Sequence, residues 1–160
     1  DWELIQGIPY AMAPSPVKGH QRLALTIGAA LLNSVEDCPD CDVLLDTDWL
    51  VRPDTVLKPD VALVCHDDAL NHISTPPVLI VEVLSPSTAR RDEGIKRREY
   101  EEQGVMYYVM IDPDTGHVRI DHHRDGAFQR LIDAKTPRFE FTGLPCPVTL
   151  DFDRLWHRRQ

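Results

Sequence analysis

One acidic residue stands inside the most apolar stretch of the chain. Glu82 lies in the run 78–84, and every other residue of that run is aliphatic. Burial of an unpaired carboxylate is costly, so such a group either takes up a proton or pairs with a cation. The position of Glu82 therefore fits either an ion pair with an arginine at the edge of the core or a carboxylate that does chemistry.

A second carboxylate, Asp60, follows Pro59 and begins the short apolar run 61–65. If this run and the run 78–84 are neighbouring antiparallel strands, the start of one lies beside the end of the other, which brings Asp60 close to Glu82. Two carboxylates at one place repel each other unless a cation bridges them. Mg²⁺, with Mn²⁺ as its substitute, binds one or two carboxylates together with water and phosphate. The pair therefore predicts a divalent-metal site.

Lys96 is the third candidate, because a helix predicted over 88–103 directly follows the run that holds Glu82. The helical spacing puts Lys96 on one face with Ala89, Asp92, Tyr100 and Gln103. Since this helix must pack back on the sheet, Lys96 can reach the two carboxylates. There it could hold or deprotonate a water and offset charge on a phosphorane-like transition state. A solvated lysine within the charge-rich stretch 90–99 is the alternative.

The elements that must position these residues alternate between strands and helices. A helix is predicted over 18–36, because apolar residues recur there on one stripe, which His20 shares. Extended runs predict strands at 4–10 (two short strands around a turn), 43–49, 61–65, 78–84 and 105–111. The helix 88–103 lies between the strands 78–84 and 105–111 in sequence, so these two strands are expected to be parallel.

The C-terminal part is expected to be a meander, with a hairpin at Asp125-Gly126 and a short helix at 153–157. The predicted fold class is therefore α/β, with a central mixed β-sheet. Three tryptophans, Trp2, Trp49 and Trp156, lie outside the clearest core runs, which makes a homodimer plausible.

The composition is that of an ordinary globular domain. The chain has 160 residues, of which 42% are apolar and 27% charged, and this predicts one domain over 1–160 rather than a disordered chain. No apolar run approaches the ~20 residues of a membrane helix. The net charge of −9 excludes a protein that holds nucleic acid by bulk electrostatics. The chain begins at Asp1 rather than Met, so we expect a truncated N-terminus, and we expect a cytoplasmic protein.

The four cysteines include one C-x-x-C pair, Cys38 and Cys41, while Cys65 and Cys146 stand alone. A structural zinc site usually requires a second pair of ligands at short spacing. His66 and His72 lie near Cys65 but match no such template. We therefore expect a polar loop with reduced thiols rather than a zinc site.

Taken together, Pro59-Asp60, Glu82 and Lys96 resemble the PD-(D/E)XK nuclease superfamily and, more narrowly, the Uma2 (DUF820) family. The resemblance rests on the segments 3–7, 59–61, 81–88 and 104–113, and on Asp92, Lys96 and Tyr100. It runs from Glu3 to about Leu155, and the string Glu-Val-Leu-Ser-Pro-Ser-Thr at 82–88 is its most specific part.

The resemblance implies a restriction-endonuclease-like core, in which helices flank the central mixed sheet and further antiparallel strands are added. It implies a Mg²⁺-dependent endonuclease that hydrolyses phosphodiester bonds of nucleic acid, with DNA as the first candidate, and a homodimer. Asp60 and Glu82 would be metal ligands, and Lys96 the catalytic lysine. Glu3 and His20 match an acidic residue of the family's first strand and a histidine of its first long helix, so they join the catalytic candidates.

The sequence departs from the broad superfamily pattern at one position. The usual lysine lies two residues after the acid, where this chain has Leu84, so Lys96 must come from the helix instead. A catalytically inactive nuclease-fold protein that binds nucleic acid or a partner protein is therefore the alternative. A structural dimer subunit, in which Glu82 pairs with an arginine, is a third possibility. Phosphate affinity is expected to be local, because basic residues gather on the helix at Arg90, Arg91, Lys96, Arg97 and Arg98.

Overall fold

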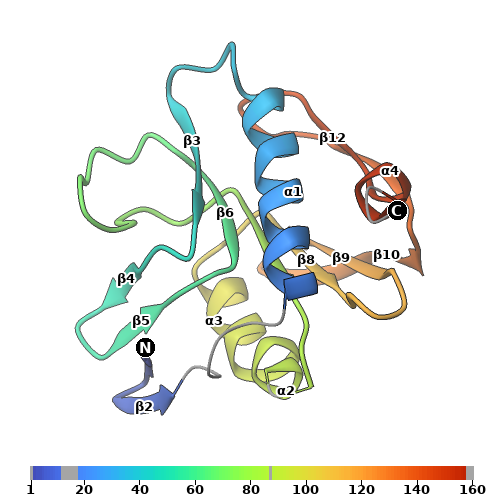
Figure 1. The fold of residues 1–160 in the computed structure, drawn as a ribbon. Coiled ribbons are helices and arrows are strands. Elements are labelled where there is room, and N and C mark those ends of the chain that lie inside the picture. The colour runs from blue at the N-terminus through green and yellow to red at the C-terminus, as the bar shows by residue number, and fades with distance from the viewer. Residues whose placement is uncertain (1, 12–17, 87, 158–160) are drawn as a thin grey trace.

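A six-stranded mixed β-sheet forms the centre of the computed structural model, which describes residues 2–11, 18–86 and 88–157 (Figure 1). The strands lie in the order β10-β9-β8-β7-β6-β3. Neighbours β7 and β8 are parallel, and the other neighbouring pairs are antiparallel. The strands are β3 (Cys41–Leu45), β6 (Val61–Cys65), β7 (Leu79–Val83), β8 (Tyr107–Ile111), β9 (His117–Arg124) and β10 (Ala127–Lys135).

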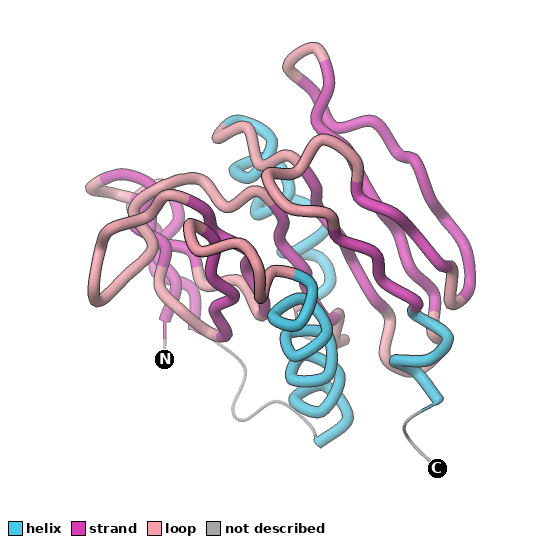
Figure 2. The backbone as a smooth tube through the Cα atoms, turned by 90° about the horizontal axis from the view of Figure 1, so that it is seen from above, coloured by secondary structure: helices cyan, strands magenta, loops and turns pink. Residues whose placement is uncertain are grey.

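Helices cover both faces of this sheet (Figure 2). Helix α1 (Lys18–Ser34) packs on one face, against the odd-numbered residues of β7. The other face receives three consecutive helical segments, α2 (Ala89–Arg91), the π-helix η1 (Asp92–Lys96) and α3 (Arg97–Glu102). Since successive residues of a strand point to opposite faces, Ile80 and Glu82 face the second helical group.

Two smaller antiparallel sheets complete the fold. The first has the order β2-β1-β5-β4, and the second pairs β11 with β12, after which the short helix α4 follows. The first small sheet packs on the same side of the central sheet as α3, and it places β1 within reach of η1. The bounds are β1 (Trp2–Ile5), β2 (Ile8–Ala11), β4 (Trp49–Arg52), β5 (Thr55–Leu57), β11 (Arg138–Phe141), β12 (Val148–Asp151) and α4 (Phe152–His157).

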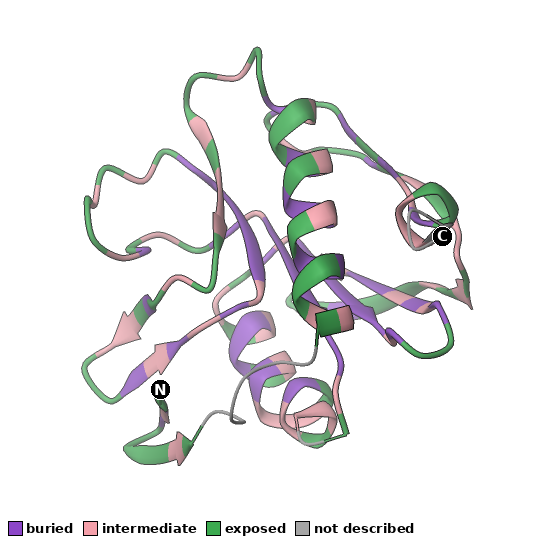
Figure 3. Cartoon of the chain, viewed as in Figure 1, coloured by how far each residue is buried: buried purple, intermediate pink, exposed green. Residues whose placement is uncertain are grey.

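Burial is most complete in the three central strands (Figure 3). Every residue of β6, β7 and β8 is buried, as expected for strands covered on both faces. Glu82 is therefore enclosed by protein on the α3 side of β7, where its carboxylate must find partners within the fold.

The structure confirms the expected α/β class, the antiparallel pairing of β6 with β7 and the parallel pairing of β7 with β8. It also confirms the hairpin at Asp125-Gly126, where both residues have positive φ angles of 52° and 82°. The predicted strand 43–49 is wrong as a single element, because the chain turns at Asp46 (φ 48°) and divides into β3 and β4. Among the described residues, no helix is long and apolar enough to cross a membrane.

The expectation of reduced thiols is also wrong for this structure, which contains two disulfides. Cys41 pairs with Cys65, and Cys38 pairs with Cys146 across 108 residues of sequence. The first pair forms because β3 and β6 are antiparallel neighbours in a register that places Cys41 opposite Cys65. Spacing along the chain could not show this, because the pairing depends on strand register and on the packing of distant segments.

Candidate active site

Glu82 lies near the end of β7 and is 2% exposed. Its Oε1 atom accepts a hydrogen bond of 2.7 Å from the Tyr100 hydroxyl and lies 2.6 Å from Lys96 Nζ. Burial raises the pKa of Glu82 well above its ordinary value; the charge of Lys96 opposes this rise, and the charge of Asp60 adds to it. The carboxylate is thus held in place, in surroundings that favour an added positive charge.

Lys96 is not a solvated lysine, because its side chain is 3% exposed. Its Nζ atom lies 3.0 Å from Glu3 Oε1 and 3.7 Å from Asp92 Oδ1, and it donates a hydrogen bond of 3.3 Å to the carbonyl of Lys58. Burial alone would lower the pKa of Lys96, but the charges of Glu82, Glu3 and Asp92 raise it well above its ordinary value. The lysine is therefore an oriented, protonated cation.

Asp60 connects the start of β6 to the end of β7. The register pairs Val61 with Val81, so the next residues outward, Asp60 and Glu82, are also neighbours. The Asp60 backbone amide donates to Glu82 Oε2 at 3.4 Å, and Asp60 Oδ2 accepts a hydrogen bond of 2.7 Å from the amide of Val83. The antiparallel pairing of β6 with β7 therefore brings the two carboxylates together, as the sequence predicted.

His20 approaches Asp60 from α1, and its Nε2 atom lies 3.2 Å from Asp60 Oδ2. Burial lowers the pKa of His20, but the hydrogen bond and the charge of Asp60 outweigh this and raise it. The side chains of His20 and Asp60 are 12% and 13% exposed, in contrast to the enclosed Glu82 and Lys96. Solvent therefore reaches the cluster from the side of His20 and Asp60.

Glu3 reaches the same cluster from β1 of the small sheet. Its Oε1 atom accepts a hydrogen bond of 2.9 Å from the Lys58 amide, and its Oε2 atom lies 3.3 Å from Arg91 Nε. Within the described part of the chain, Glu3 Oε2 and Arg91 Nε are buried atoms without a hydrogen-bond partner. Besides their ion pair, Glu3 Oε2 can still accept a hydrogen bond and Arg91 Nε can still donate one, for example with a water.

Negative charge is in excess around Lys96. The carboxylates that gather here are Glu3, Asp60, Glu82 and Asp92, and they face the cations Lys96 and Arg91 together with His20. Asp46 lies nearby, and burial together with the charge of Asp60 raises its pKa. An excess of buried negative charge favours the uptake of a cation.

Asp60 and Glu82 fit a hard divalent cation that keeps part of its water shell. Glu82 Oε2 has only a long contact of 3.4 Å, while Oε1 is occupied by Tyr100 and Lys96. Among the described residues, no third His, Cys, Asp or Glu side chain is arranged with Asp60 and Glu82 to hold a metal by protein ligands alone. An ion here would therefore depend on water and substrate for its remaining ligands, which is the usual manner of Mg²⁺.

All five sequence-derived candidates, Glu3, His20, Asp60, Glu82 and Lys96, lie in one cluster. Arg91, Asp92 and Tyr100 also belong to the cluster, although they were not among the predicted site residues. The helical spacing that placed Asp92 and Tyr100 on the Lys96 face could have identified them. Arg91 gave no such signal, because it stands in a run of charged residues. An ion pair of Glu82 with arginine was also a wrong alternative, since Lys96 takes that place and Arg91 pairs with Glu3.

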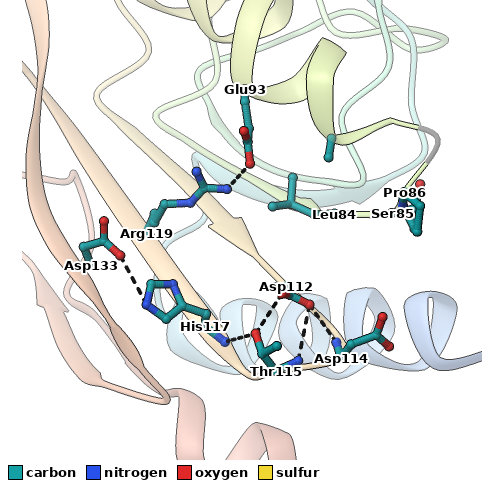
Figure 4. A pocket seen from close by; sticks show the side chains of 11 residues that line it. Leu84, Ser85, Pro86, Glu93, Asp112, Asp114, Thr115, His117, Arg119 and Asp133 are labelled. Atoms are coloured by element: carbon teal, nitrogen blue, oxygen red, sulfur yellow. Dashed lines mark hydrogen bonds and ion pairs between the residues drawn. The ribbon is translucent and has the colours of Figure 1, made fainter.

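A cavity of about 610 Å³ begins two residues beyond Glu82, at Leu84 (Figure 4). Glu93 forms an ion pair with Arg119 across it, and His117 Nε2 lies 3.2 Å from Asp133 Oδ1. In the part of the chain that the structure describes, the five clustered residues do not line this cavity. Its lining holds more acidic than basic side chains, which disfavours phosphate.

Three comparisons relate the chain to known proteins. The Uma2 family model, described as "Putative restriction endonuclease", matches residues 1–144. The "Uncharacterized protein slr1290" of Synechocystis sp. is 29% identical over 129 residues, which cover 77% of this chain. The match spans 66% of that relative, slightly less than two thirds of its length.

A solved structure has a similar fold. It is described as "a putative nuclease belonging to DUF820" from Anabaena variabilis, and it has a TM-score of 0.74 and a sequence identity of 16%. The similarity covers 98% of this chain and 89% of that one. At this identity the likeness shows a common fold.

Proposed function

Because this chain belongs to the Uma2 family, we propose that it is a divalent-metal-dependent endonuclease that hydrolyses phosphodiester bonds of nucleic acid, with DNA as the first candidate. The observation that carries the proposal is the position of Lys96, a buried cation 2.6 Å from Glu82 and 3.0 Å from Glu3. It lies on η1, beside the strand ends that carry Glu82 and Asp60. A cation beside a carboxylate pair suits a reaction that builds negative charge on a phosphate.

In this proposal, Asp60 and Glu82 hold Mg²⁺, or Mn²⁺ as its substitute. The bound ion would activate a water and offset charge on the phosphate oxygens. Lys96 stabilises the developing negative charge, and Glu3 and the Lys58 carbonyl fix the direction of its ammonium group. His20 orients Asp60, and the Tyr100 hydroxyl orients Glu82. Lys96, on the helix, thus takes the role of the superfamily's usual lysine, whose position is occupied by Leu84 in this chain.

Phosphate affinity from the helix is weaker in this structure than its sequence suggests. Arg91 and Lys96 are engaged with the buried carboxylates, and Arg97 pairs with Asp121 at 2.8 Å. Arg90 and Arg98 are the exposed members of the group. Binding of nucleic acid is therefore expected to depend on the metal and to fall with salt.

The activity is tested on supercoiled plasmid DNA with Mg²⁺, with Mn²⁺ and with a chelator. We expect nicking or linearisation that requires the metal and is lost in Glu82→Gln and Lys96→Met. Arg98→Met is the matched control, because it removes an exposed positive charge from the same helix. Cleavage that continues undiminished in both site variants would remove this assignment.

A second candidate function is a non-catalytic protein of nuclease fold that binds nucleic acid or a partner protein. The observation in its favour is that Glu82 and Lys96 are each 2% exposed and bonded to each other. Calorimetry with Mg²⁺ or Mn²⁺ separates the two candidates. Saturable metal binding that is lost in Asp60→Asn supports the metal-dependent enzyme. A heat of metal addition that is the same in Asp60→Asn as in the wild type supports the second candidate.

We also propose a cytoplasmic homodimer. The indication from the three tryptophans is weaker than expected, because Trp49 is 1% exposed and belongs to the core. Trp2 and Ile8, in contrast, are 63% and 55% exposed on the small sheet. Light scattering after gel filtration tests the dimer, and a mass of one chain at micromolar concentration would contradict it.

A further inference from the structure

The four cysteines of the chain meet at one place, far from the candidate active site. Cys38 lies in the turn between α1 and β3, Cys41 begins β3, Cys65 ends β6, and Cys146 precedes β12. The disulfides are Cys38–Cys146 and Cys41–Cys65, and the Sγ atoms of Cys41 and Cys146 are 3.7 Å apart. The two disulfides therefore touch, and their sulfurs form a single cluster, here called the four-sulfur cluster.

The fold builds this cluster from three separate segments. The register of β3 and β6 places Cys41 opposite Cys65. The Cys41 amide donates a hydrogen bond of 3.1 Å to the carbonyl of Cys38, which closes the C-x-x-C turn. Cys146 arrives from the segment before β12, and the Cys38, Cys41 and Cys146 side chains pack with the core on the α1 face.

We propose that the four-sulfur cluster is a structural zinc site when its cysteines are reduced. Zinc held by four cysteines is tetrahedral with Zn–S bonds of about 2.3 Å, which sets the sulfurs roughly 3.8 Å apart. The Cys41–Cys146 separation of 3.7 Å already matches this edge, whereas the two disulfide-bonded pairs must move apart to the same distance when they are reduced. The C-x-x-C pair supplies two ligands from one turn, and Cys65 and Cys146 supply the other two.

The site exists in the reduced state alone, because disulfide sulfurs are not ligands. A thiol reductant supplies four electrons and four protons, which break the two S–S bonds and give four thiols, while the reductant becomes disulfide. Zn²⁺ then displaces the four protons and forms four Zn–S bonds, without electron transfer. Thiols persist in a reducing compartment, so this inference rests on the proposed cytoplasmic location.

The position of the cluster indicates a structural role. Asp60 precedes β6 and Cys65 ends it, so the two lie roughly 16 Å apart along the strand. Four protein ligands leave no open position for a substrate. Cys65 is 7% and Cys146 is 4% exposed, so the metal would be shielded where it joins α1, β6 and the segment before β12. Zinc would therefore stabilise the sheet from the end opposite the candidate active site.

The first test uses the wild-type chain, purified with a phosphine reductant and analysed for metal and thiol content. We expect one zinc per chain, and thiols that react with a disulfide reagent only after the zinc is removed. A reduced chain that has four free thiols and takes up no zinc from added ZnCl₂ would overturn the proposal. Bound iron in place of zinc would overturn it too, because four cysteines also suit iron or iron–sulfur sites.

Co²⁺ provides a second readout on the same wild-type protein. Tetrahedral Co²⁺ with thiolate ligands shows intense visible bands and a sulfur-to-cobalt charge-transfer band. We expect this spectrum in the reduced chain and its disappearance when Zn²⁺ is added. An octahedral Co²⁺ spectrum without charge transfer contradicts the proposed ligand set.

Variants distinguish this site from the candidate active site. Cys38→Ser and Cys146→Ser should each lose the stoichiometric zinc. His66→Ala, beside Cys65 but exposed, should keep it. Asp60→Asn and Glu82→Gln should also keep it, so failure of the nuclease proposal leaves this result unaffected. Zinc content and a four-thiolate Co²⁺ spectrum that survive in Cys146→Ser would refute the assignment.

Discussion

The Lys96 ammonium group lies 2.6 Å from Glu82 Oε1, and both side chains are 3% exposed. This pair joins the helical crossover to the strand before it, since η1, the middle segment of the crossover, carries Lys96 and β7 carries Glu82. A π-helical turn is a frequent feature of functional sites, because it shifts the side chains that follow. Glu3 and Asp92 add further negative charge around the ammonium group, so Lys96 stabilises the fold as well as the proposed reaction.

Replacement of Lys96 by methionine should therefore affect both stability and activity. The buried carboxylates lose their shared cation, and we expect the free energy of unfolding to fall by about 3 kcal/mol. Plasmid cleavage should fall by at least ~10²-fold, which is typical for the loss of one group that stabilises transition-state charge. Urea denaturation and the initial rate of plasmid nicking measure the two effects.

The double variant Glu82→Leu with Lys96→Met provides the control for stability. The double variant removes the Glu82 carboxylate together with its cation, so it should lose less stability than the sum of the two single variants, although Glu3 and Asp92 still lose the ammonium group. Arg98→Met, on the exposed side of the same helix, should change stability by less than about 0.5 kcal/mol. If the stability losses of the two single variants add up to the loss of the double variant, the two residues are not coupled.

Tyr100→Phe tests the hydroxyl that holds Glu82. The hydrogen bond of 2.7 Å is lost, while the ring keeps its contacts with Trp49 and Tyr108. We expect a loss of about 1–3 kcal/mol in stability, because a buried carboxylate loses a donor. Cleavage should fall, but less than in Lys96→Met, since the metal ligand and the lysine both remain.

Tyr107→Phe is the matched control for this variant. Tyr107 is 1% exposed, and its hydroxyl donates a hydrogen bond of 2.8 Å to the carbonyl of Thr142 on the opposite face of the central sheet. Its removal should lower stability and leave cleavage by the folded protein unchanged. Equal losses of cleavage in the two variants would show that Tyr100 acts through stability alone.

The centre of the site could be derived from the sequence because it depends on adjacent elements. The apolar run around Glu82 had to be a central strand, and Asp60 followed from one antiparallel pairing. Lys96 followed from the helix that must return over the sheet. These inferences use strand alternation and short connections, which are visible along the chain.

Other parts of the site depend on long-range packing, which the sequence does not show. Glu3 joins the cluster because β1 pairs with β5, and that small sheet packs beside η1. The resemblance suggested Glu3, but periodicity gave no reason for its position. The pairing of Cys38 with Cys146 spans 108 residues and depends on how two turns far apart in the sequence pack against each other. The π-helical turn likewise has no clear signal in a charged stretch.

Asp121 offers a test of how the helical group is held on the sheet. It is 0% exposed in β9, and it forms ion pairs with Arg97 of α3 and Arg130 of β10. Asp121→Ala should lower the free energy of unfolding by about 1–3 kcal/mol. The loss should stay within this range because the two arginines are 26% and 35% exposed and can be hydrated.

Asp133→Ala is the control for Asp121, since it also removes a carboxylate beside Arg130. Asp133 is 54% exposed and lies 3.4 Å from Arg130, so its ion pair should contribute less than about 1 kcal/mol. Urea denaturation of the two variants side by side tests the difference. Equal effects would show that burial of Asp121 adds nothing to the interaction.

Asp67, in the loop after β6, should make the stability of the protein depend on pH. Burial raises the pKa of Asp67, but hydrogen bonds from the amides of Thr75, Ala69 and Ser74 outweigh it and hold the pKa well below its ordinary value. The hydrogen bonds that the Ser74 and Thr75 amides donate to Asp67 Oδ2 are 2.6 Å and 2.9 Å long. They fix a loop in which Ile73 is fully buried.

A pKa that is lower in the folded than in the unfolded state gives stability that is present above the unfolded value of about 4 and lost as the pH falls toward the folded value. Asp67→Asn should therefore be less stable than the wild type at pH 7, by about 1–2 kcal/mol. The difference should shrink below about pH 4, because the unfolded wild-type chain then takes up a proton at Asp67 that the folded chain does not bind. Asp68→Asn, at the exposed neighbouring position, should match the wild type throughout. Urea midpoints between pH 3 and pH 7 measure this, and a difference for Asp67→Asn that is constant over that range would contradict the assigned role of its charge.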